Sequence, residues 1–424
     1  MKRVLIISYY WPPSAGAGVQ RWLKFTKYLP QHGWTPVVYT PENPEAPALD
    51  ASLERDIPLQ CEVIKQPIFE PYDLYKRFTG RQKEEKVNAG FLHEGRKPGG
   101  KDRIAVWIRG NLFIPDARRF WVSASVKYLA KYLEDHPVDV MVSTGPPHSM
   151  HLIAMALKKR FSIPWVADFR DPWTGIDFYD QLMLTRYADR KHHRLERKVL
   201  QGADEVLTIG WESARQLQQL GGRPVAVITN GFDEEDLTLQ PLEREEGAPF
   251  VIRHLGAMNR DRNHDNFWQA VRWLVEDPAF EREVSVELIG KNDVAVRDSV
   301  ERYGLEKVVQ FVPYVAHEKV GTLLQSADLL YLALNNTANA RGILTGKLFE
   351  YLASGTPILG VGPVDGDAAK VLEQCHAGVM KAFGEPFHIH PSWASREGEK
   401  RDEIASFSRR ALTGKLVEIL DSLI

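Results

Sequence analysis

The sequence lacks the features that mark several classes of protein. It has only two cysteines in 424 residues, Cys61 and Cys375, which are too few for a disulfide framework or a zinc site. No stretch approaches the roughly 18 consecutive apolar residues that span a membrane, and the apolar run Val4–Ile7 is too short for the core of a signal peptide. The formal net charge of -2 gives no overall attraction to nucleic acid or lipid. We therefore expect a cytoplasmic protein that binds no nucleic acid and touches a membrane at most peripherally.

Short β-branched runs alternate with longer amphipathic segments, a pattern typical of parallel sheets covered by helices on both faces. In the first half, the runs predicted as strands are Val4–Tyr9, Pro36–Tyr39, Cys61–Gln66, Val138–Thr144, Pro164–Phe169, Glu205–Ile209 and Val225–Thr229. In the second half, they are Phe250–Leu255, Val284–Ile289, Val308–Val312, Leu329–Leu334, Pro357–Val361 and Gly378–Ala382. The repetition predicts an α/β protein with two similar doubly wound units in tandem.

The polar, proline-bounded segment 239–249 is typical of a linker. It divides the chain into a predicted first domain over residues 1–238 and a second over 250–405. Residues 406–424 carry apolar side chains at helical spacing, which predicts a closing helix that packs on one unit, such as the N-terminal one, or bridges both.

One insertion, residues 74–121, interrupts the strand rhythm of the first half. Between Lys76 and Arg109 it carries ten Lys or Arg against four acids. Such a run is often a solvated loop, but the sequence that follows mixes aromatic residues with arginines, a combination that suits a lipid interface. Arg118, Arg119 and Trp121 are accordingly candidates for contact with an acceptor or a membrane.

The first predicted strand is followed by SYYWPPSAGAGVQRW, from Ser8 to Trp22. In parallel α/β sheets, ligands bind where strands end and helices begin, and Gly16 and Gly18 allow the backbone to approach a ligand. The pattern lacks the third glycine of a dinucleotide fingerprint, whose position Arg21 occupies, so a nicotinamide site is disfavoured. A plain turn remains the alternative.

Another predicted strand ends in VADFRDPW, which places Asp168, Arg170 and Asp171 at its carboxyl end as candidate catalytic residues. The alternative is an Asp–Arg pair with Asp171 as a helix cap. His148 follows a neighbouring strand and is a further candidate for contact with an acceptor or a membrane. It precedes His151 by three residues, but no third metal ligand is evident. We expect His192 and His193, adjacent on a basic amphipathic segment, to lie at the surface.

The segment ANARGILTGKLFEYLASGTPILGVGP begins at Ala338. Lys347 and Glu350 are three residues apart, so one helical face offers a cation and a carboxylate. The backbone amides of Leu344, Thr345 and Gly346 at the start of this helix suit a phosphate. In the second half, the first strand ends at Gly256, and Arg260 or Arg262 beyond it suits a diphosphate. A surface ion pair and a solvated loop are the alternatives.

Together these pieces resemble the retaining glycosyltransferases of family 4. The likeness rests on the glycine loop, DFRDPW, VITNGFDEEDL from Val227, the Gly-Arg opening of the second half, and GKLFEYLASGTPIL. It implies the GT-B fold, in which two Rossmann-like doubly wound parallel-sheet domains face each other across an interdomain cleft. It also implies transfer of a sugar from a nucleotide-diphosphate donor to a glycan or lipid-linked acceptor, in surface polysaccharide synthesis.

By the same resemblance, the second domain holds the donor. Glu350 would bind the ribose, and Arg260 and Lys347 would face the diphosphate, with the loop of Gly16 and Gly18 approaching the phosphates. The resemblance implies no metal and no cofactor. Two positions depart from the family pattern: Gly342 stands where an acid is frequent, and Arg170 where many members have histidine. A sugar-nucleotide epimerase and a non-catalytic sugar-nucleotide-binding subunit are the alternative functions.

Overall fold

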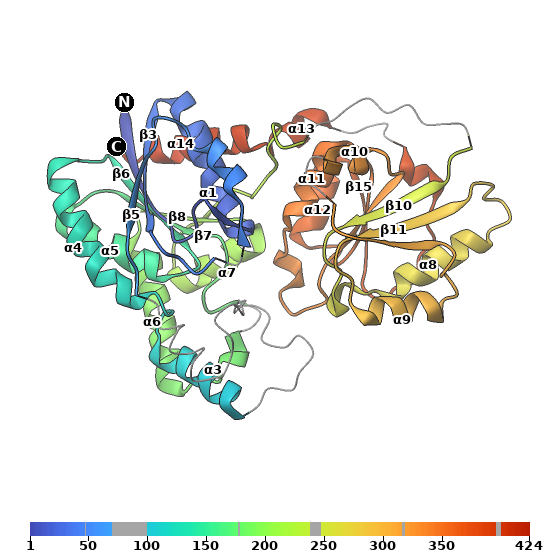
Figure 1. The fold of residues 1–424 in the computed structure, drawn as a ribbon, viewed down its shortest axis with the longest axis horizontal. Coiled ribbons are helices and arrows are strands. Elements are labelled where there is room, and N and C mark those ends of the chain that lie inside the picture. Colours follow the sequence, from blue (N-terminus) through green and yellow to red (C-terminus); the bar gives the residue numbers. More distant parts are fainter. Residues whose placement is uncertain (47, 70–99, 177–178, 238–246, 316–318, 396–399) are drawn as a thin grey trace. The chain divides into compact units, whose positions relative to one another are not determined.

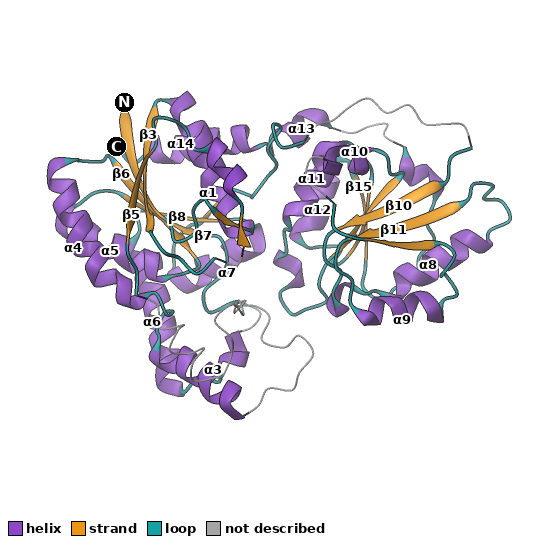
Figure 2. Cartoon of the chain, viewed as in Figure 1, coloured by secondary structure: helices purple, strands orange, loops and turns teal. Residues whose placement is uncertain are grey.

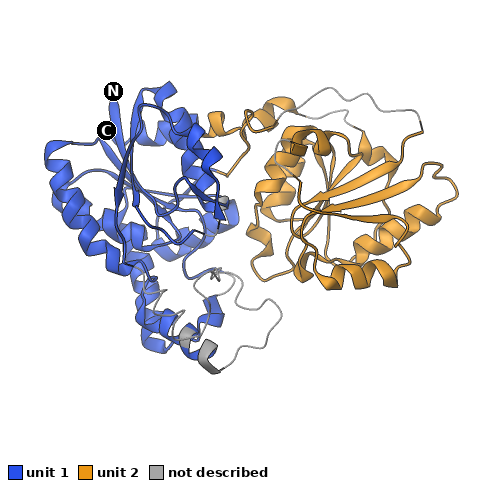
Figure 3. Cartoon of the chain, in the orientation of Figure 1, with its two compact units in different colours: residues 1–228, 413–424 blue, residues 229–412 orange. Residues whose placement is uncertain are grey.

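The computed structural model describes residues 1–46, 48–69, 100–176, 179–237, 247–315, 319–395 and 400–424. The chain divides into two compact units, residues 1–228 with 413–424 (unit 1) and residues 229–412 (unit 2), shown in blue and orange in Figure 3. The division falls after Ile228, ahead of the predicted linker, most of which lies outside the described residues. The predicted basic run from Lys76 also lies outside them as far as residue 99.

Unit 1 contains a seven-stranded parallel sheet in the order β5-β3-β1-β6-β7-β8-β9. Its strands are β1 (Lys2–Ile7), β3 (Trp34–Pro41), β5 (Glu62–Gln66), β6 (Val140–Gly145), β7 (Trp165–Phe169), β8 (Glu205–Thr208) and β9 (Ala226–Val227). Its helices are α1 (Ala17–Tyr28), α3 (Gly100–Leu112), α4 (Arg119–Asp135), α5 (Ser149–Phe161), α6 (Arg186–Gly202) and α7 (Trp211–Gly221). The short strands β2 (Ser14–Ala15) and β4 (Ala48–Leu49) pair antiparallel beside it.

Both faces of this sheet are covered, as Figures 1 and 2 show, because its central strands are apolar on both sides. Residues Val4–Ile7 of β1 are fully buried. The chain leaves β1 toward β3, while β6 lies on the other side of β1, so the strand order reverses there. In open α/β sheets, the crevice at such a reversal, outside the carboxyl ends of the strands, is where ligands bind.

Unit 2 contains a six-stranded parallel sheet in the order β12-β11-β10-β13-β14-β15, which reverses between β10 and β13. Its strands are β10 (Phe250–Leu255), β11 (Val284–Ile289), β12 (Val309–Val312), β13 (Leu329–Ala333), β14 (Ile358–Val361) and β15 (Gly378–Lys381). Its helices are α8 (Asp265–Glu276), α9 (Val294–Arg302), α10 (Val320–Gln325), α11 (Gly346–Ser354), α12 (Asp367–Cys375) and α13 (Arg401–Ala405).

The last helix, α14 (Arg409–Asp421), lies within the segment predicted to close the chain. Its residues from Thr413 onward belong to unit 1, where Asp421 accepts hydrogen bonds from Lys2 and from the Trp34 indole. The prediction of two doubly wound parallel sheets is confirmed. Within the described parts of the chain, every helix is too short or too polar to cross a lipid bilayer.

Candidate functional site

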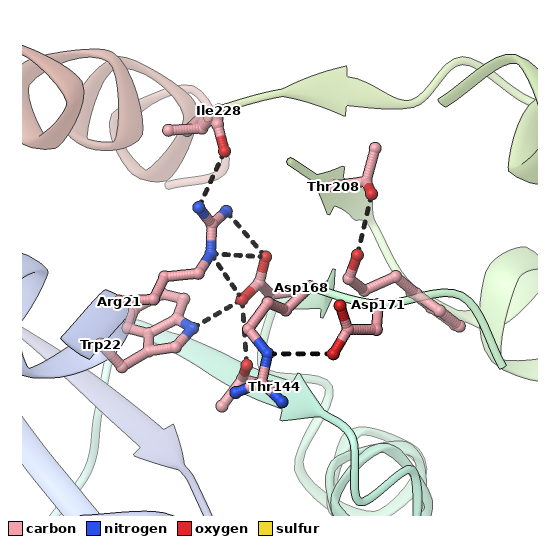
Figure 4. A network of polar contacts seen from close by, with 9 residues as sticks. Arg21, Trp22, Thr144, Asp168, Asp171, Thr208 and Ile228 are labelled. Carbon is pink, nitrogen blue, oxygen red and sulfur yellow. Dashed lines mark hydrogen bonds and ion pairs between the residues drawn. The ribbon is translucent and has the colours of Figure 1, made fainter. Parts of the chain in front are cut away.

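The carboxyl end of β7 in unit 1 carries a fully buried ion pair between Asp168 and Arg21, drawn in Figure 4. The Arg21 Nη2 lies 2.9 Å from Asp168 Oδ1, and its Nε lies 3.0 Å from Oδ2. The Trp22 indole and the Thr144 hydroxyl donate to the same carboxylate, at 2.7 and 3.0 Å. Burial alone would raise the pKa of Asp168, but the Arg21 charge and these donors outweigh it and lower that pKa.

This arrangement ties the start of α1 to the ends of β6 and β7. Arg21 also donates through Nη1 to the backbone carbonyl of Ile228, at 2.8 Å. The carboxylate of Asp168 has no exposed surface and is already occupied by donors from three side chains. In this conformation Asp168 therefore positions its neighbours rather than touching a substrate. Its ion-pair partner is Arg21, while Arg170 forms a longer pair with Asp171.

Arg170 lies over Gly18, which brings two predicted site residues together from distant parts of the sequence. A Cβ atom on Gly18 would lie 2.7 Å from the Arg170 Nη1, so a larger residue here would displace the guanidinium from this position. The Arg170 Nε lies 3.4 Å from Asp171 Oδ2, and its Nη2 lies 3.4 Å from the Pro146 carbonyl. Gly16 begins α1 with a φ of 109°, a conformation that favours glycine.

A cavity of about 310 Å³ opens at this edge of the unit 1 sheet. Its walls come from α3, the loop before α4, and the loops that follow β1, β6 and β7. The side chains that matter here are Tyr10, Arg109, Arg118, His148, Arg170 and Trp173. The volume is at the lower end of the roughly 300–1,000 Å³ that small-molecule sites occupy.

The histidines of this cavity are held neutral. His192 accepts from the Trp173 indole at 3.0 Å and is 3.2 Å from the Gly110 carbonyl, to which its other nitrogen donates. Burial lowers the pKa of His192, so the prediction that it lies at the surface is wrong. The His148 ring stacks on Trp173 with centroids 4.9 Å apart, and burial lowers its pKa well below the usual value.

His151 is buried behind His148, and its Nδ1 is hydrogen-bonded at 2.8 Å to the Ser143 hydroxyl, which also accepts from the Trp165 indole. Burial lowers the pKa of His151 to about 3. Within the described residues, neither His148 nor His151 belongs to a group of three metal-binding side chains.

The residues predicted to contact an acceptor or a membrane lie in different environments in the structure. Arg118 is buried, lines the cavity and donates to the Tyr9 hydroxyl at 3.2 Å. Arg119 is exposed at the start of α4. Trp121 is 1% exposed and stacks on Tyr39 with ring centroids 4.9 Å apart, so it belongs to the core and cannot touch a lipid surface. A sequence that mixes aromatic and basic residues does not show which of the aromatic side chains are buried in the core.

In unit 2, Lys347 of α11 lies directly over Gly256, the residue that follows β10. A Cβ atom on Gly256 would collide with the Lys347 Cε and Nζ, and its φ of 110° also favours glycine. The Lys347 Nζ is 3.4 Å from Nε2 of His254, which accepts because its Nδ1 donates to the Tyr331 carbonyl. Burial, and then the charge of Arg262, lower the pKa of Lys347 to about 7, while nearby Glu350 raises it.

The structure selects Arg262, rather than Arg260, as the second cation of this cluster. Arg262 donates through Nε to Asn335 in the loop after β13, at 2.7 Å, and through Nη1 to the Ala257 carbonyl, at 2.9 Å. Arg260 is exposed and lines a separate cavity with Asp298 and Arg302. Sequence spacing offered both arginines, and the prediction of Arg260 as the partner of Lys347 is not supported by this placement.

The helix predicted to follow Thr345 is present, and its start is the predicted place for a phosphate. Thr345 is the N-cap of this helix, and its Oγ1 is buried without a hydrogen-bond partner among the described residues. Leu344 is buried, whereas Gly346 is exposed, with open space where a Cβ would lie. Free backbone N–H groups at such a helix start favour an anion. Gly342 ends a short 3-10 turn, Ala340–Gly342, in the loop that precedes it.

Residues 16–231, slightly more than half of the chain, match a family model described as a glycosyl transferase 4-like domain. The chain belongs to this glycosyltransferase family. No curated protein sequence matches it significantly. The predictions of a family 4 member and of the GT-B fold are thus confirmed, the fold also by the solved structures below.

Several solved glycosyltransferase-like structures cover the whole chain at low sequence identity. Sucrose-phosphate synthase from Thermosynechococcus elongatus is 14% identical, with a TM-score of 0.63, and 100% of this chain covers 99% of that one. HepE from Anabaena, in complex with UDP and glucose, is 16% identical with a TM-score of 0.60, and both chains are covered completely. A trehalose-6-phosphate protein from E. coli, bound with UDP-2-fluoro glucose, is 11% identical with a TM-score of 0.56 and the same coverage. At these identities the likeness shows the fold alone.

Sequence reasoning missed two polar groups of this glycosyltransferase. His254 sits inside the apolar run of β10, where a single histidine gives no signal until Lys347 is seen beside it. Arg109 was counted only as part of a basic run, yet it lines the unit 1 cavity. For His254 the available signal was a polar residue next to the carboxyl end of a central strand.

Proposed function

We propose that this glycosyltransferase moves a hexose from a nucleotide-diphosphate-sugar, bound by unit 2, to a glycan or lipid-linked acceptor, bound by the unit 1 cavity. The observation that carries the proposal is the partly buried pair of cations, Lys347 and Arg262, beside the start of α11. Two structures of the same fold, HepE and the trehalose-6-phosphate protein, contain UDP or a UDP-sugar, which supports the donor class. The pathway would be assembly of a cell-surface polysaccharide on the cytoplasmic side.

The chemistry explains why cations gather in unit 2. Breaking the bond between the anomeric carbon and the donor oxygen places negative charge on the departing diphosphate. Lys347, Arg262 and the amides near Thr345 would stabilise that charge more in the transition state than in the bound donor. In a retaining transfer, the donor phosphate itself would take the acceptor proton. Arg170 cannot act as a neutral base, so it would position the acceptor or balance charge.

A binding experiment tests the donor class. Thermal shift and calorimetry with UDP-, GDP-, ADP- and CMP-sugars should identify one that stabilises the protein by about 2.7 kcal/mol at 100 times its dissociation constant. Lys347→Met should weaken that binding, whereas Lys307→Met, at an exposed position of unit 2, should not. If no nucleotide sugar binds, or if Lys347→Met binds as well as the parent, the proposal is wrong.

Turnover experiments separate transfer from the alternatives. With donor alone, an epimerase would release an isomerised sugar, whereas a transferase would give slow hydrolysis. Binding without turnover over a panel of acceptors would indicate a non-catalytic subunit, and loss of turnover in Glu350→Ala would exclude that. NMR of the product linkage decides between retention and inversion, and unchanged activity in EDTA is expected for a metal-independent reaction.

A peripheral membrane contact is part of the proposal and rests on α3 and α6, which pack together in unit 1. Helix α3 exposes Ile104, Trp107 and Leu112. Helix α6 exposes a row of arginines at four-residue spacing, Arg186, Arg190 and Arg194. Apolar and cationic side chains on adjacent helices suit the surface of an anionic bilayer.

Vesicle flotation tests this contact. The protein should float with phosphatidylglycerol vesicles and less with phosphatidylcholine vesicles. Trp107→Gln with Arg190→Gln should lose flotation, and Tyr314→Gln, which changes an exposed aromatic of unit 2, should keep it. Equal flotation of the parent, the double variant and Tyr314→Gln would show that α3 and α6 do not bind the membrane. The proposal of sugar transfer would not be affected.

A further inference from the structure

We infer that the unit 1 cavity recognises an acidic group, a phosphate or a carboxylate, on the acceptor, and that Arg109, Arg118 and Arg170 are the residues that select it. The inference rests on the proposed function and narrows its acceptor to an anionic class. It follows from three observations on the cavity: the number of cations in its wall, the smaller number of carboxylates and their existing contacts, and the neutrality of its histidines.

Three guanidinium groups from separate segments line this one cavity: Arg109 from α3, Arg118 from the turn before α4, and Arg170 from the loop after β7. Arg109 makes no hydrogen bond or ion pair with the part of the chain that the structure describes. Among the described residues, the polar contacts of Arg170 are long: 3.4 Å to Asp171 and 3.4 Å to the Pro146 carbonyl. A partly buried guanidinium with such weak partners favours an anion that bonds it through two oxygens.

Among the described residues that line the cavity, two aspartates, Asp116 and Asp171, stand against the three arginines, so the acids do not balance the cations. Asp116 uses its carboxylate to hold neighbouring backbone: it accepts from the Ser149 amide at 2.9 Å, the Ser149 hydroxyl at 2.8 Å and the Arg118 amide at 2.9 Å. Asp171 is 43% exposed, so water weakens its attraction for Arg170. The cavity therefore keeps an excess of positive charge.

The other side chains that line the cavity are neutral, and several of them are aromatic. His148 and His192 have pKa values lowered by burial, so they add no charge near neutral pH. The stacked rings of His148 and Trp173 lie beside Tyr10 in the same wall. Aromatic faces suit the apolar face of a sugar ring, and the arginines around them suit a charged substituent on that ring.

Calorimetry on the donor-free protein tests this selectivity with three probes: methyl glucuronide for a carboxylate, glucose 6-phosphate for a phosphate, and neutral methyl glucoside. At least one acidic probe should bind ten times more tightly than the glucoside or better. Arg109→Met and Arg170→Met should each reduce that preference severalfold. Arg160→Met, which removes an exposed arginine of α5, should leave it unchanged.

Whether phosphate or carboxylate binds more tightly identifies the source of the acidic group. Equal binding of acidic and neutral probes, no binding of either acidic probe at about 10 mM, or an unchanged preference in both arginine variants would each overturn the inference. Thermal unfolding of each variant confirms that it is folded. Donor binding to unit 2, measured through Lys347, is independent of these outcomes, so failure here is distinguishable from failure of the proposed function.

Discussion

The two domains have the same architecture but differ in whether the charged side chains at their strand ends have a partner of opposite charge. In unit 1, the deepest polar group at the strand ends, Asp168, is neutralised by Arg21 and fully hydrogen-bonded within the protein. In unit 2, the strand ends hold two partly buried cations, Lys347 and Arg262, and burial together with the charge of Arg262 lowers the pKa of Lys347. A satisfied ion pair builds structure, whereas adjacent, partly buried cations are suited to an anion from outside.

The largest expected effect is the loss of stability on breaking the buried Asp168–Arg21 ion pair of unit 1. Asp168→Ala would leave the Arg21 charge buried and uncompensated, at a cost of about 3–5 kcal/mol in the free energy of unfolding. Chemical denaturation followed by tryptophan fluorescence measures it. The double variant Arg21→Met with Asp168→Leu should recover much of the loss, and Lys347→Met in unit 2 should not destabilise the protein. A mild effect of Asp168→Ala would show that the two domains do not differ as stated.

The second-largest expected effect is a lower kcat when a cation of unit 2 is removed. Lys347→Met should lower kcat by about 10²–10³, equivalent to about 2.7–4 kcal/mol, because it removes a cation from the charge that develops on the leaving diphosphate. Steady-state kinetics with saturating donor measure it. Lys307→Met serves as the matched control, and a kcat within twofold of the parent in Lys347→Met would argue against this role.

A third prediction concerns the packing of Arg170 on Gly18. Gly18→Ala should displace the guanidinium, because the added Cβ would lie 2.7 Å from its Nη1. Misplacement of this kind should lower kcat/KM for the acceptor on the order of 10- to 100-fold, with donor binding intact. Gly414→Ala, also in a helix of unit 1, has its nearest atom at 3.9 Å and should have no effect. Equal activity of the two variants would show that the position of Arg170 does not matter for the acceptor.

The smallest effect is the pH dependence of donor binding. Since the pKa of Lys347 is lowered to about 7, this lysine loses its charge as the pH rises above that value in the free protein. Donor affinity should therefore be highest below pH 7 and fall by at most about tenfold per pH unit above it. In Lys347→Met the affinity should be lower and nearly flat between pH 7 and 9 when measured by calorimetry. A parent profile without slope would contradict the lowered pKa.

The strand predictions show where sequence patterns are strong. Strands β10 and β11 have the predicted bounds, because most residues of a strand buried on both faces are apolar and the change in pattern at each end is clear. The glycines at their ends also follow from local rules, since Gly256 has a backbone conformation that other residues rarely adopt. The DFRDPW segment was correctly placed at a strand end for the same reason.

The individual site contacts were less predictable. Arg260 and Arg262 are equivalent by spacing, and only the hydrogen bond to Asn335 from another strand end shows that Arg262 joins Lys347. The partner of Asp168 could not be read from the segment around it, because Arg21 comes from a helix 147 residues earlier. Trp121 and His192 were assigned to the surface because their neighbours are charged, although both are buried.

The sequence by itself determined the two parallel sheets, their order along the chain and the glycines at the strand ends, because apolar periodicity and backbone sterics act within a few residues. Only the tertiary structure decided which charges meet: Asp168 with Arg21, Arg170 over Gly18, and Lys347 beside His254. These pairings join residues from separate crossovers of the same sheet. Electrostatic energy depends on distance and burial in space, and linear spacing does not contain either quantity.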